Sequence, residues 1–218
     1  RAVENVRLRH MLMFWFDSRL SRLSVQNRYP PDGHSSVLPY LYYVPPLISE
    51  MNPFTVFEAA IQRLSTAFSN YSPSLGNTII GTGDTGQLNT IPNNCIDYIF
   101  TDPPVFDYIY FSDVNFLRES WYKVRTNTEA EVVVNKAKAK ELLDYQRLMR
   151  RCFEEYYRVL KPNRWITIIF PSARAHIWKL IQEAIVGAGF IVAGAYAMDR
   201  QRSYKIISTL VRKDLVVS

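Results

Sequence analysis

The sequence predicts an α/β fold that forms the second half of a doubly wound sheet and closes with an antiparallel pair of strands. Strand and helix patterns alternate along the later part of the chain, and the last two strand patterns are joined by a polar turn. In order, the expected elements are a strand at 96–101, a helix at 140–160, a strand at 165–170, a helix at 176–186, and strands at 190–198 and 204–211. The 218 residues, 48% of them hydrophobic, suffice for one such domain with a full core. We place an N-terminal helical and loop region at 1–74, packing on the core, and the sheet domain at 75–218.

The helix at 140–160 has the clearest pattern in the chain. Apolar side chains recur along one face and charged side chains along the other. Lys161-Pro162-Asn163 then ends the helix before the strand at 165–170. The stretch before it, 124–140, has no such pattern and is expected to be an exposed excursion.

Two helices are expected in the N-terminal third. The segment 3–23 carries a broad apolar surface, which favours a core helix. A second helix at 53–68 has Asn52 as its cap and Pro53 at its first position. Between them, the segment 27–46 is rich in Pro, Tyr and Ser, and is expected to be a long irregular connection.

A glycine-rich stretch, GTGDTG at 81–86, follows a short predicted strand at 78–80. Its letters match the G-x-G-x-x-G dinucleotide fingerprint, which needs a helix opening at the third glycine. Only residues 87–91 precede the next turn signal, so a flexible turn beside the sheet edge is favoured over a dinucleotide site. Asp84 in this turn is available to a ligand hydroxyl or amino group.

The run IDYIFTDPPV at 96–105 is the most informative segment. Its apolar residues predict a buried, central parallel strand that ends on Asp102. Ligands of open α/β sheets bind in the crevice outside the carboxyl ends of the strands. Proline fixes its own φ and cannot continue the ladder, so Asp102 and the carbonyls of Pro103 and Pro104 are expected to form a stiff edge of acceptors. Such an edge suits an amino group.

Seven aromatic residues fall within the seventeen residues 106–122, soon after this acid. They are Phe106, Tyr108, Tyr110, Phe111, Phe116, Trp121 and Tyr122. A helix capped at Ser112 or Asp113 would bury Phe116, Leu117 and Trp121. Those nearest the acid belong either to the core or to a pocket that stacks a flat base.

Composition limits the classes of function. The net charge of +6 permits an anionic partner such as nucleic acid without requiring one. Cys95 and Cys152 lie far apart and the three histidines are isolated, so no zinc site, other metal site or disulfide framework is predicted. The longest apolar run, 11–16, is too short to cross a bilayer, and no secretory leader precedes it. We expect a reducing, cytoplasmic location and no membrane partner.

Several stretches match a known pattern. Asp-Pro-Pro is accompanied by FSDVNFLRESW from Phe111, VNK from Val134, YYRVLKPNRW from Tyr156 and RKDLVVS from Arg212. In these stretches the chain resembles the large prokaryotic adenine-specific DNA methylases, whose versions are YSELNF…WEAW, VNK, YYRVLKPGRW and KQDLVIS. The resemblance covers about 75–218. It implies a partial Rossmann-like class I methyltransferase sheet, S-adenosylmethionine as cofactor and DNA as partner.

The resemblance also implies roles for individual residues. Asp102 and the carbonyl of Pro103 would accept hydrogen bonds from the exocyclic amino group of a flipped base, turning its lone pair toward the methyl sulfonium. Positioning rather than a strong base would carry the reaction. The implied site consists of catalytic Asp102, Pro103, Pro104 and Val105, substrate-binding Phe106, Tyr108 and Lys136, and cofactor-binding Asp84 and Thr101.

Two features depart from the family pattern. Val105 stands where an aromatic is expected, although Phe106 beside it would supply a ring if the turn were shifted. The family's phenylalanine- and glycine-rich turn, which holds the methionine end of the cofactor, is missing, since 81–86 lies directly before the Asp-Pro-Pro strand. Because the chain opens at Arg1 within a helical pattern, we expect an upstream segment or a partner chain to carry that turn.

Three interpretations of function remain open. The first is an adenine-N6 DNA methyltransferase, with cytosine N4 as a second target because both are exocyclic amines. The second is a non-catalytic nucleic-acid-binding subunit on a degenerate methyltransferase fold, favoured by Val105 and the missing turn. The third is a methylase of RNA or of a small molecule.

Overall fold

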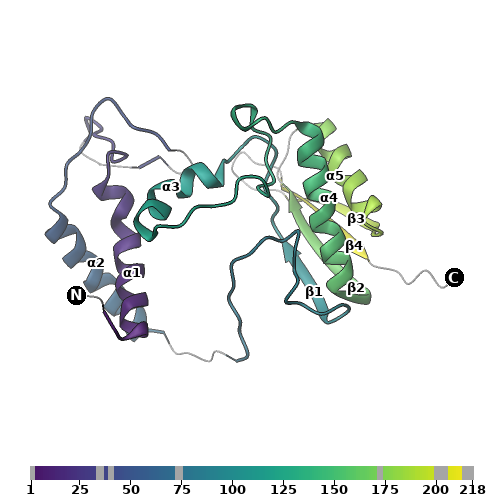
Figure 1. Ribbon diagram of the computed structural model, residues 1–218, viewed down its shortest axis with the longest axis horizontal. Coiled ribbons are helices and arrows are strands. Elements are labelled where there is room, and N and C mark those ends of the chain that lie inside the picture. Colours follow the sequence, from purple (N-terminus) through teal and green to yellow (C-terminus); the bar gives the residue numbers. More distant parts are fainter. Residues whose placement is uncertain are drawn as a thin grey trace. The chain divides into compact units, whose positions relative to one another are not determined.

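The computed structural model describes residues 3–32, 37–38, 42–71, 76–170, 174–198 and 206–212. They form two compact units, shown in Figure 1. The first unit contains the residues up to 80 together with 111–126, and the second contains 81–110 and the residues from 127 onward. The chain thus passes between the units three times, whereas the sequence led us to expect one boundary at residue 74.

The first unit is helical. Its elements are α1 (Val6–Leu20), a 3-10 helix (Ser21–Leu23), α2 (Pro53–Ser69) and α3 (Phe111–Tyr122). The expected N-terminal helices are confirmed, and Asn52 caps α2 by accepting a hydrogen bond from the Phe54 amide at 2.9 Å. Trp15 joins α1 to α2, because its indole N–H donates to the Phe57 carbonyl at 3.0 Å and the two ring centroids lie 4.7 Å apart.

The apolar surfaces of this unit are less covered than the sequence suggests. In α1, expected to be a core helix, Leu20 is the one residue that is buried, and Phe14 is 55% exposed. In α3, the expected buried residues Phe116 and Trp121 are more than half exposed. The helical period was therefore correct and the inferred burial was wrong, because the described helices of this unit are too few to enclose every apolar side chain.

The second unit is an α/β structure built on one four-stranded sheet. Its elements are β1 (Ile96–Thr101), a 3-10 helix (Lys136–Lys138), α4 (Leu142–Val159), β2 (Leu160–Phe170), α5 (Ala175–Gly187), β3 (Ile191–Met198) and β4 (Ile206–Arg212). The strand order is β1-β2-β4-β3. β1 is parallel to β2, while β4 lies between β2 and β3 and is antiparallel to both. The α/β class and the closing antiparallel pair are confirmed.

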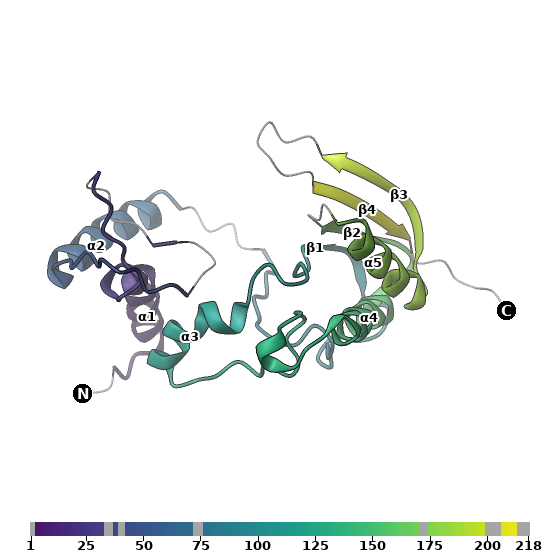
Figure 2. The ribbon, with the colours of Figure 1, turned by 90° about the horizontal axis from the view of Figure 1, so that it is seen from above.

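The core lies between this sheet and the pair α4 and α5, which pack side by side (Figure 2). The largest fully buried side chains come from both layers: Tyr145, Phe153, Ile177 and Ile181 from the helices, and Ile166, Ile168 and Phe170 from β2. Alternate residues of the strands point away from the helices, and Phe100 is 62% exposed. Among the described residues, helices therefore cover one face of the sheet, and the second helix layer of a doubly wound fold is not seen.

Strand β1 differs from the expected central, buried strand. It pairs with β2 alone among the described residues, so it is an edge strand, and Tyr98 on its open face is exposed. The residues expected as a preceding strand, 78–80, are not in a strand, and Ile79 and Ile80 are 97% and 93% exposed. The apolar pattern predicted the strand β1 correctly. The pattern alone could not show whether another strand pairs with the second edge of β1 or whether a helix layer covers its second face.

Three smaller predictions concern the start of β2, the loop before α4 and the C-terminal residues. β2 begins at Leu160, directly after α4 and earlier than expected, and its pairing with β1 shifts register before Trp165. The excursion before α4 is irregular, as expected, but Val133, Asn135 and Lys140 within it are buried. The polar turn at 199–203, the first residues of the last predicted strand and most of the RKDLVVS stretch lie outside the described residues.

Candidate functional site

Asp102 directly follows β1, at the carboxyl end of the strand, as the sequence predicts. Its side chain remains solvent-exposed, and no described residue donates a hydrogen bond to it or pairs with it. Partial desolvation by its neighbours raises the pKa of the Asp102 carboxyl above its ordinary value. The structure thus leaves this carboxylate available to a ligand.

The two prolines after this acid have different environments. Pro103 is buried, and Pro104 is half-buried. The carbonyl of Pro104 accepts a hydrogen bond from the hydroxyl of Tyr145 at 2.8 Å, inside the core. This corrects the expected edge of acceptors: the Pro104 carbonyl is occupied by the protein, which leaves Asp102 and Pro103 as its members.

Val105 and Phe106 both pack against the hydrophobic core. The ring of Phe106 meets Tyr145 edge-on at 6.0 Å and His176 at 6.5 Å, and the guanidinium of Arg174 lies 5.4 Å from its centroid. A ring held in this way is not free to stack on a base. The idea that Phe106 replaces the missing aromatic at position 105 is therefore not supported by these contacts.

Tyr108 is mostly exposed, at 64%, as is Phe100 on the other side of Asp102, at 62%. The amide of Tyr108 donates to the carbonyl of Val105 at 2.9 Å, which closes a tight turn after the prolines. Among the predicted substrate-binding residues, Tyr108 therefore offers an open ring face.

The VNK stretch lies beside the same segment. The amide of Val134 donates to the carbonyl of Phe106 at 2.9 Å, so the loop before α4 is joined to the turn after Pro104. Asn135 is buried and caps the short 3-10 helix by accepting from the Ala137 amide. Lys136, the predicted substrate-binding lysine, follows it and is exposed.

Lys140 stabilises the loop before α4. Its buried ammonium donates to the carbonyls of Glu129 and Glu131, and the burial lowers the pKa of Lys140. Arginines of α4 are also engaged within the chain: Arg147 pairs with Asp144, Arg150 with Glu154, and Arg151 donates to the Gly86 carbonyl. Much of the local basic charge is therefore structural, whereas Lys136 is exposed.

The two predicted cofactor-binding residues, Asp84 and Thr101, are brought into one neighbourhood by Tyr156 of α4. The Tyr156 hydroxyl lies 3.1 Å from the hydroxyl of Thr101 and also bonds to Thr85. One carboxylate oxygen of Asp84 accepts from the Gly86 amide at 2.8 Å. The hydroxyl of Thr101 and one oxygen of Asp84 thus each make one bond within the chain, and both groups keep further hydrogen-bonding capacity.

The turn at 81–86 does not open a helix. Residues 87–95 run as turns along α4, where Arg158 donates to the carbonyls of Leu88 and Ile91. This agrees with the preference for a turn over a dinucleotide fingerprint. The bond from Arg151 to the Gly86 carbonyl also fixes the glycine-rich turn against α4.

Sequence reasoning missed four side chains of the site: Tyr145, Tyr156, Arg174 and His176. The two tyrosines lie on the apolar face of α4, where a helical period identifies them as core and says nothing of their hydroxyls. Their eleven-residue spacing, close to three helical turns, was the available signal, since two buried hydroxyls on one face need two partners.

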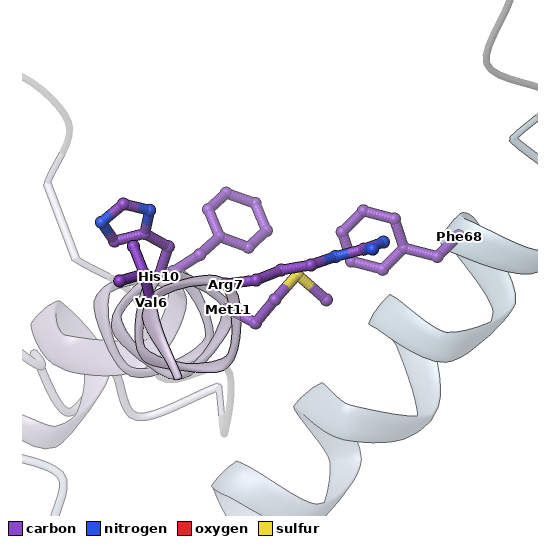
Figure 3. Close-up of a pocket in the computed structure, with 6 residues that line it drawn as sticks. Val6, Arg7, His10, Met11 and Phe68 are labelled. Carbon is purple, nitrogen blue, oxygen red and sulfur yellow. The ribbon is translucent and has the colours of Figure 1, made fainter. Parts of the chain in front are cut away.

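A separate hollow of about 680 Å³ lies in the first unit, between α1 and α2. Val6, Met11, Phe14 and Phe68 line it together with Arg7 and His10, and Figure 3 shows Arg7 extending toward the ring of Phe68. No predicted site residue lines this hollow.

In the part of the chain that the structure describes, no group of three His, Cys, Asp or Glu side chains is arranged to hold a metal ion. None of its helices is long and apolar enough to cross a membrane.

No protein-family profile and no curated protein matches the chain. Its structure is similar to several solved structures at low identity. One is a protein of Thermus thermophilus named as a candidate DNA modification methylase: it is 15% identical, the match covers 63% of this chain and 54% of that chain, and the TM-score is 0.37. A SAM-dependent methyltransferase of Methanosarcina mazei is 12% identical; the match covers 72% of this chain and 78% of that chain, and the TM-score is 0.36. TrmN of Thermus thermophilus is 13% identical; the match covers 73% of this chain and 33% of that chain, and the TM-score is 0.36.

The chain spans about half the length of the Thermus methylase, 54%. That methylase has also been solved in complex with S-adenosyl-L-methionine. Among these neighbours, one is named a SAM-dependent methyltransferase and another a candidate DNA modification methylase. At these identities and scores they assign no substrate or activity to this chain.

Proposed function

We propose that this chain is the base-positioning part of a methyltransferase that transfers a methyl group from S-adenosylmethionine to an exocyclic amino group of DNA, with adenine N6 as its target. The observation that carries the proposal is the carboxylate of Asp102. It follows β1 directly, has no partner among the described residues, and is backed by the buried Pro103.

The chemistry of an amino group fits this edge. An exocyclic amine conjugated with a base has a delocalised lone pair and two N–H donors. The Asp102 carboxylate and the Pro103 carbonyl would each accept one N–H, which turns the nitrogen lone pair out of the plane of the base. The carboxylate forms the stronger of the two bonds because it is charged.

The flipped base would stack on Tyr108. Stacking of one base on an aromatic side chain contributes about 1–3 kcal/mol and does not depend on which base is present. The exposed ring of Tyr108 lies on the turn that follows the prolines. Lys136 is exposed on the loop joined to the same turn through Val134, and would contact a neighbouring phosphate.

S-adenosylmethionine would supply the electrophilic methyl group. The residues present account for a small part of a site for it: Asp84 and Thr101 each make one bond within the chain and keep further hydrogen-bonding capacity. We assign to Asp84 and Thr101 contacts with the adenosine end. The turn for the methionine end would come from an upstream segment or a partner chain.

A second function has an observation in its favour. Val105 packs into the core where the related methylases have an aromatic, and the ring of Phe106 is held by its neighbours. A subunit that binds nucleic acid without catalysis would tolerate this loss. Cytosine N4 is a further target for the enzyme, because its amino group has the same donors.

The experiment uses the natural full-length protein, together with any subunit that copurifies with it. Binding of S-adenosylmethionine is measured by calorimetry, and transfer of its labelled methyl group is followed on unmodified DNA and on RNA. The proposal expects label on DNA and none on RNA. Binding of DNA with no cofactor binding and no label supports the non-catalytic subunit instead.

A further inference from the structure

We propose that Tyr145 is a positioning residue for the candidate site: by holding the carbonyl of Pro104, its hydroxyl fixes where Asp102 and the Pro103 carbonyl point. The effect on catalysis rests on the proposed function, whereas the effect on the backbone does not. Tyr145 is fully buried on α4, and its bond to Pro104 joins residues 41 positions apart in the sequence.

The segment from Asp102 to Pro104 has few free dihedral angles. Both prolines lock φ near −65°, and a residue that precedes proline is restricted in ψ. That restriction applies to Asp102 and to Pro103. Two soft angles remain: φ of Asp102, where the segment leaves β1, and ψ of Pro104, which sets the direction of the carbonyl that Tyr145 holds. One hydrogen bond therefore fixes the free angle at the far end of the segment.

The residues after Pro104 show why an anchor is needed. Phe106 adopts a positive φ of 46°, a left-handed conformation that is unusual for a bulky residue. Such a conformation persists only when its surroundings hold it in place. Tyr145 contacts the Phe106 ring edge-on, and Val134 donates to the Phe106 carbonyl at 2.9 Å. If the bond to Pro104 is lost, relaxation of Phe106 is transmitted through the two prolines to Asp102.

The hydroxyl is not needed for packing alone. A phenylalanine would fill the same space on α4, and a buried hydroxyl is unfavourable unless it is bonded. Desolvation raises the pKa of Tyr145 to about 12, so the hydroxyl stays protonated and remains a donor over the whole physiological range. The structure thus keeps a buried donor aimed at one carbonyl of the candidate site.

The test compares Tyr145→Phe with Tyr98→Phe in the natural full-length protein. The control also removes one hydroxyl bond, from Tyr98 to Thr167 at 2.6 Å on the open face of the sheet. Amide hydrogen exchange is measured at residues 105–108, and methyl transfer is measured with kcat and KM separated. We expect exchange at 105–108 to rise about tenfold in Tyr145→Phe, kcat to fall by about tenfold, and KM for S-adenosylmethionine to change less than twofold. Tyr98→Phe should alter none of these.

The outcomes separate the two proposals. Exchange at 105–108 that stays unchanged in Tyr145→Phe overturns the positioning role, and so does an equal loss of kcat in Tyr98→Phe. If the natural protein transfers no methyl group but exchange still rises in Tyr145→Phe alone, the proposed function fails while Tyr145 still positions the segment. Replacing Tyr145 by 4-aminophenylalanine returns an N–H donor at the same point, and should restore the exchange and kcat toward those of the natural protein.

Discussion

Replacing Asp102 by asparagine should lower methyl transfer while slightly stabilising the protein. The carboxylate accepts no hydrogen bond from any described residue, so its neutralisation removes no support from the fold. A hydrogen bond to a charged group contributes about 1.5–3 kcal/mol, and the uncharged amide retains part of it. We expect kcat to fall roughly 10- to 150-fold, with little change in the affinity for S-adenosylmethionine.

The effect on stability follows from the pKa of Asp102, which desolvation raises in the folded state. A carboxyl whose folded pKa is raised binds its proton more tightly in the folded state, so its contribution to stability is greatest at low pH and is lost as pH rises through the folded pKa. At pH 7 the ionised group therefore opposes folding. Because the side chain is exposed, Asp102→Asn should raise Tm by only about 1–2 °C at pH 7, and the gain should shrink toward pH 4.

Asp97 provides the matched control at the other end of β1. It pairs with Lys161 at 2.9 Å, and the hydrogen bond from Lys161 is the main cause that lowers the pKa of Asp97. Asp97→Asn should therefore lower Tm at neutral pH, lose this effect as pH falls through the depressed pKa, and leave methyl transfer within twofold. The reasoning is refuted if Asp102→Asn lowers transfer less than threefold, or if it lowers Tm as Asp97→Asn does.

Three further results are expected. Tyr108→Ala should weaken binding of DNA about 5- to 150-fold with an unchanged Tm, whereas an unchanged Kd in a filter-binding assay would remove Tyr108 from the base pocket. Phe153→Ala should destabilise the second unit by about 3–5 kcal/mol in urea titration, because the ring is fully buried between α4 and the sheet, and a loss below 1 kcal/mol would contradict that core. Burial raises the pKa of the Cys152 thiol to about 11. In a Cys95→Ser variant, alkylation of Cys152 should therefore be slow at pH 8, accelerate toward pH 11 and become fast on unfolding. Rapid labelling of the folded protein at pH 8 would show instead that the thiol is accessible.

The sequence predicted the helices and strands well because their signals are local. The amphipathic face of α4, the proline and asparagine that begin α2, and the apolar run of β1 each depend on residues within a few turns. Coverage of these faces is not local. The exposure of Tyr98 on β1 and of Trp121 on α3 depends on which elements pack opposite them, and no periodicity within a segment reports that.

The same distinction applies to the site. Asp102 was found because an acid between a strand and two prolines is recognisable along the chain. The hydrogen bond from Tyr145 to the Pro104 carbonyl could not be predicted in that way. Its donor lies far along the sequence, on a helix whose pattern indicates only that its apolar face is buried. The bond between the Thr101 hydroxyl and Tyr156, another residue of that helix, was missed for the same reason.

The identity of the methylated product tests the central claim most directly. DNA incubated with the natural full-length protein and S-adenosylmethionine is hydrolysed to nucleosides, and the methylated species is identified by mass spectrometry, in parallel with Asp102→Asn. If the edge formed by Asp102 and Pro103 holds an amino group, the product is N6-methyladenine, and its yield falls at least tenfold in the variant. Methylation at a ring carbon or ring nitrogen, or an equal yield from Asp102→Asn, would contradict the role assigned to this edge.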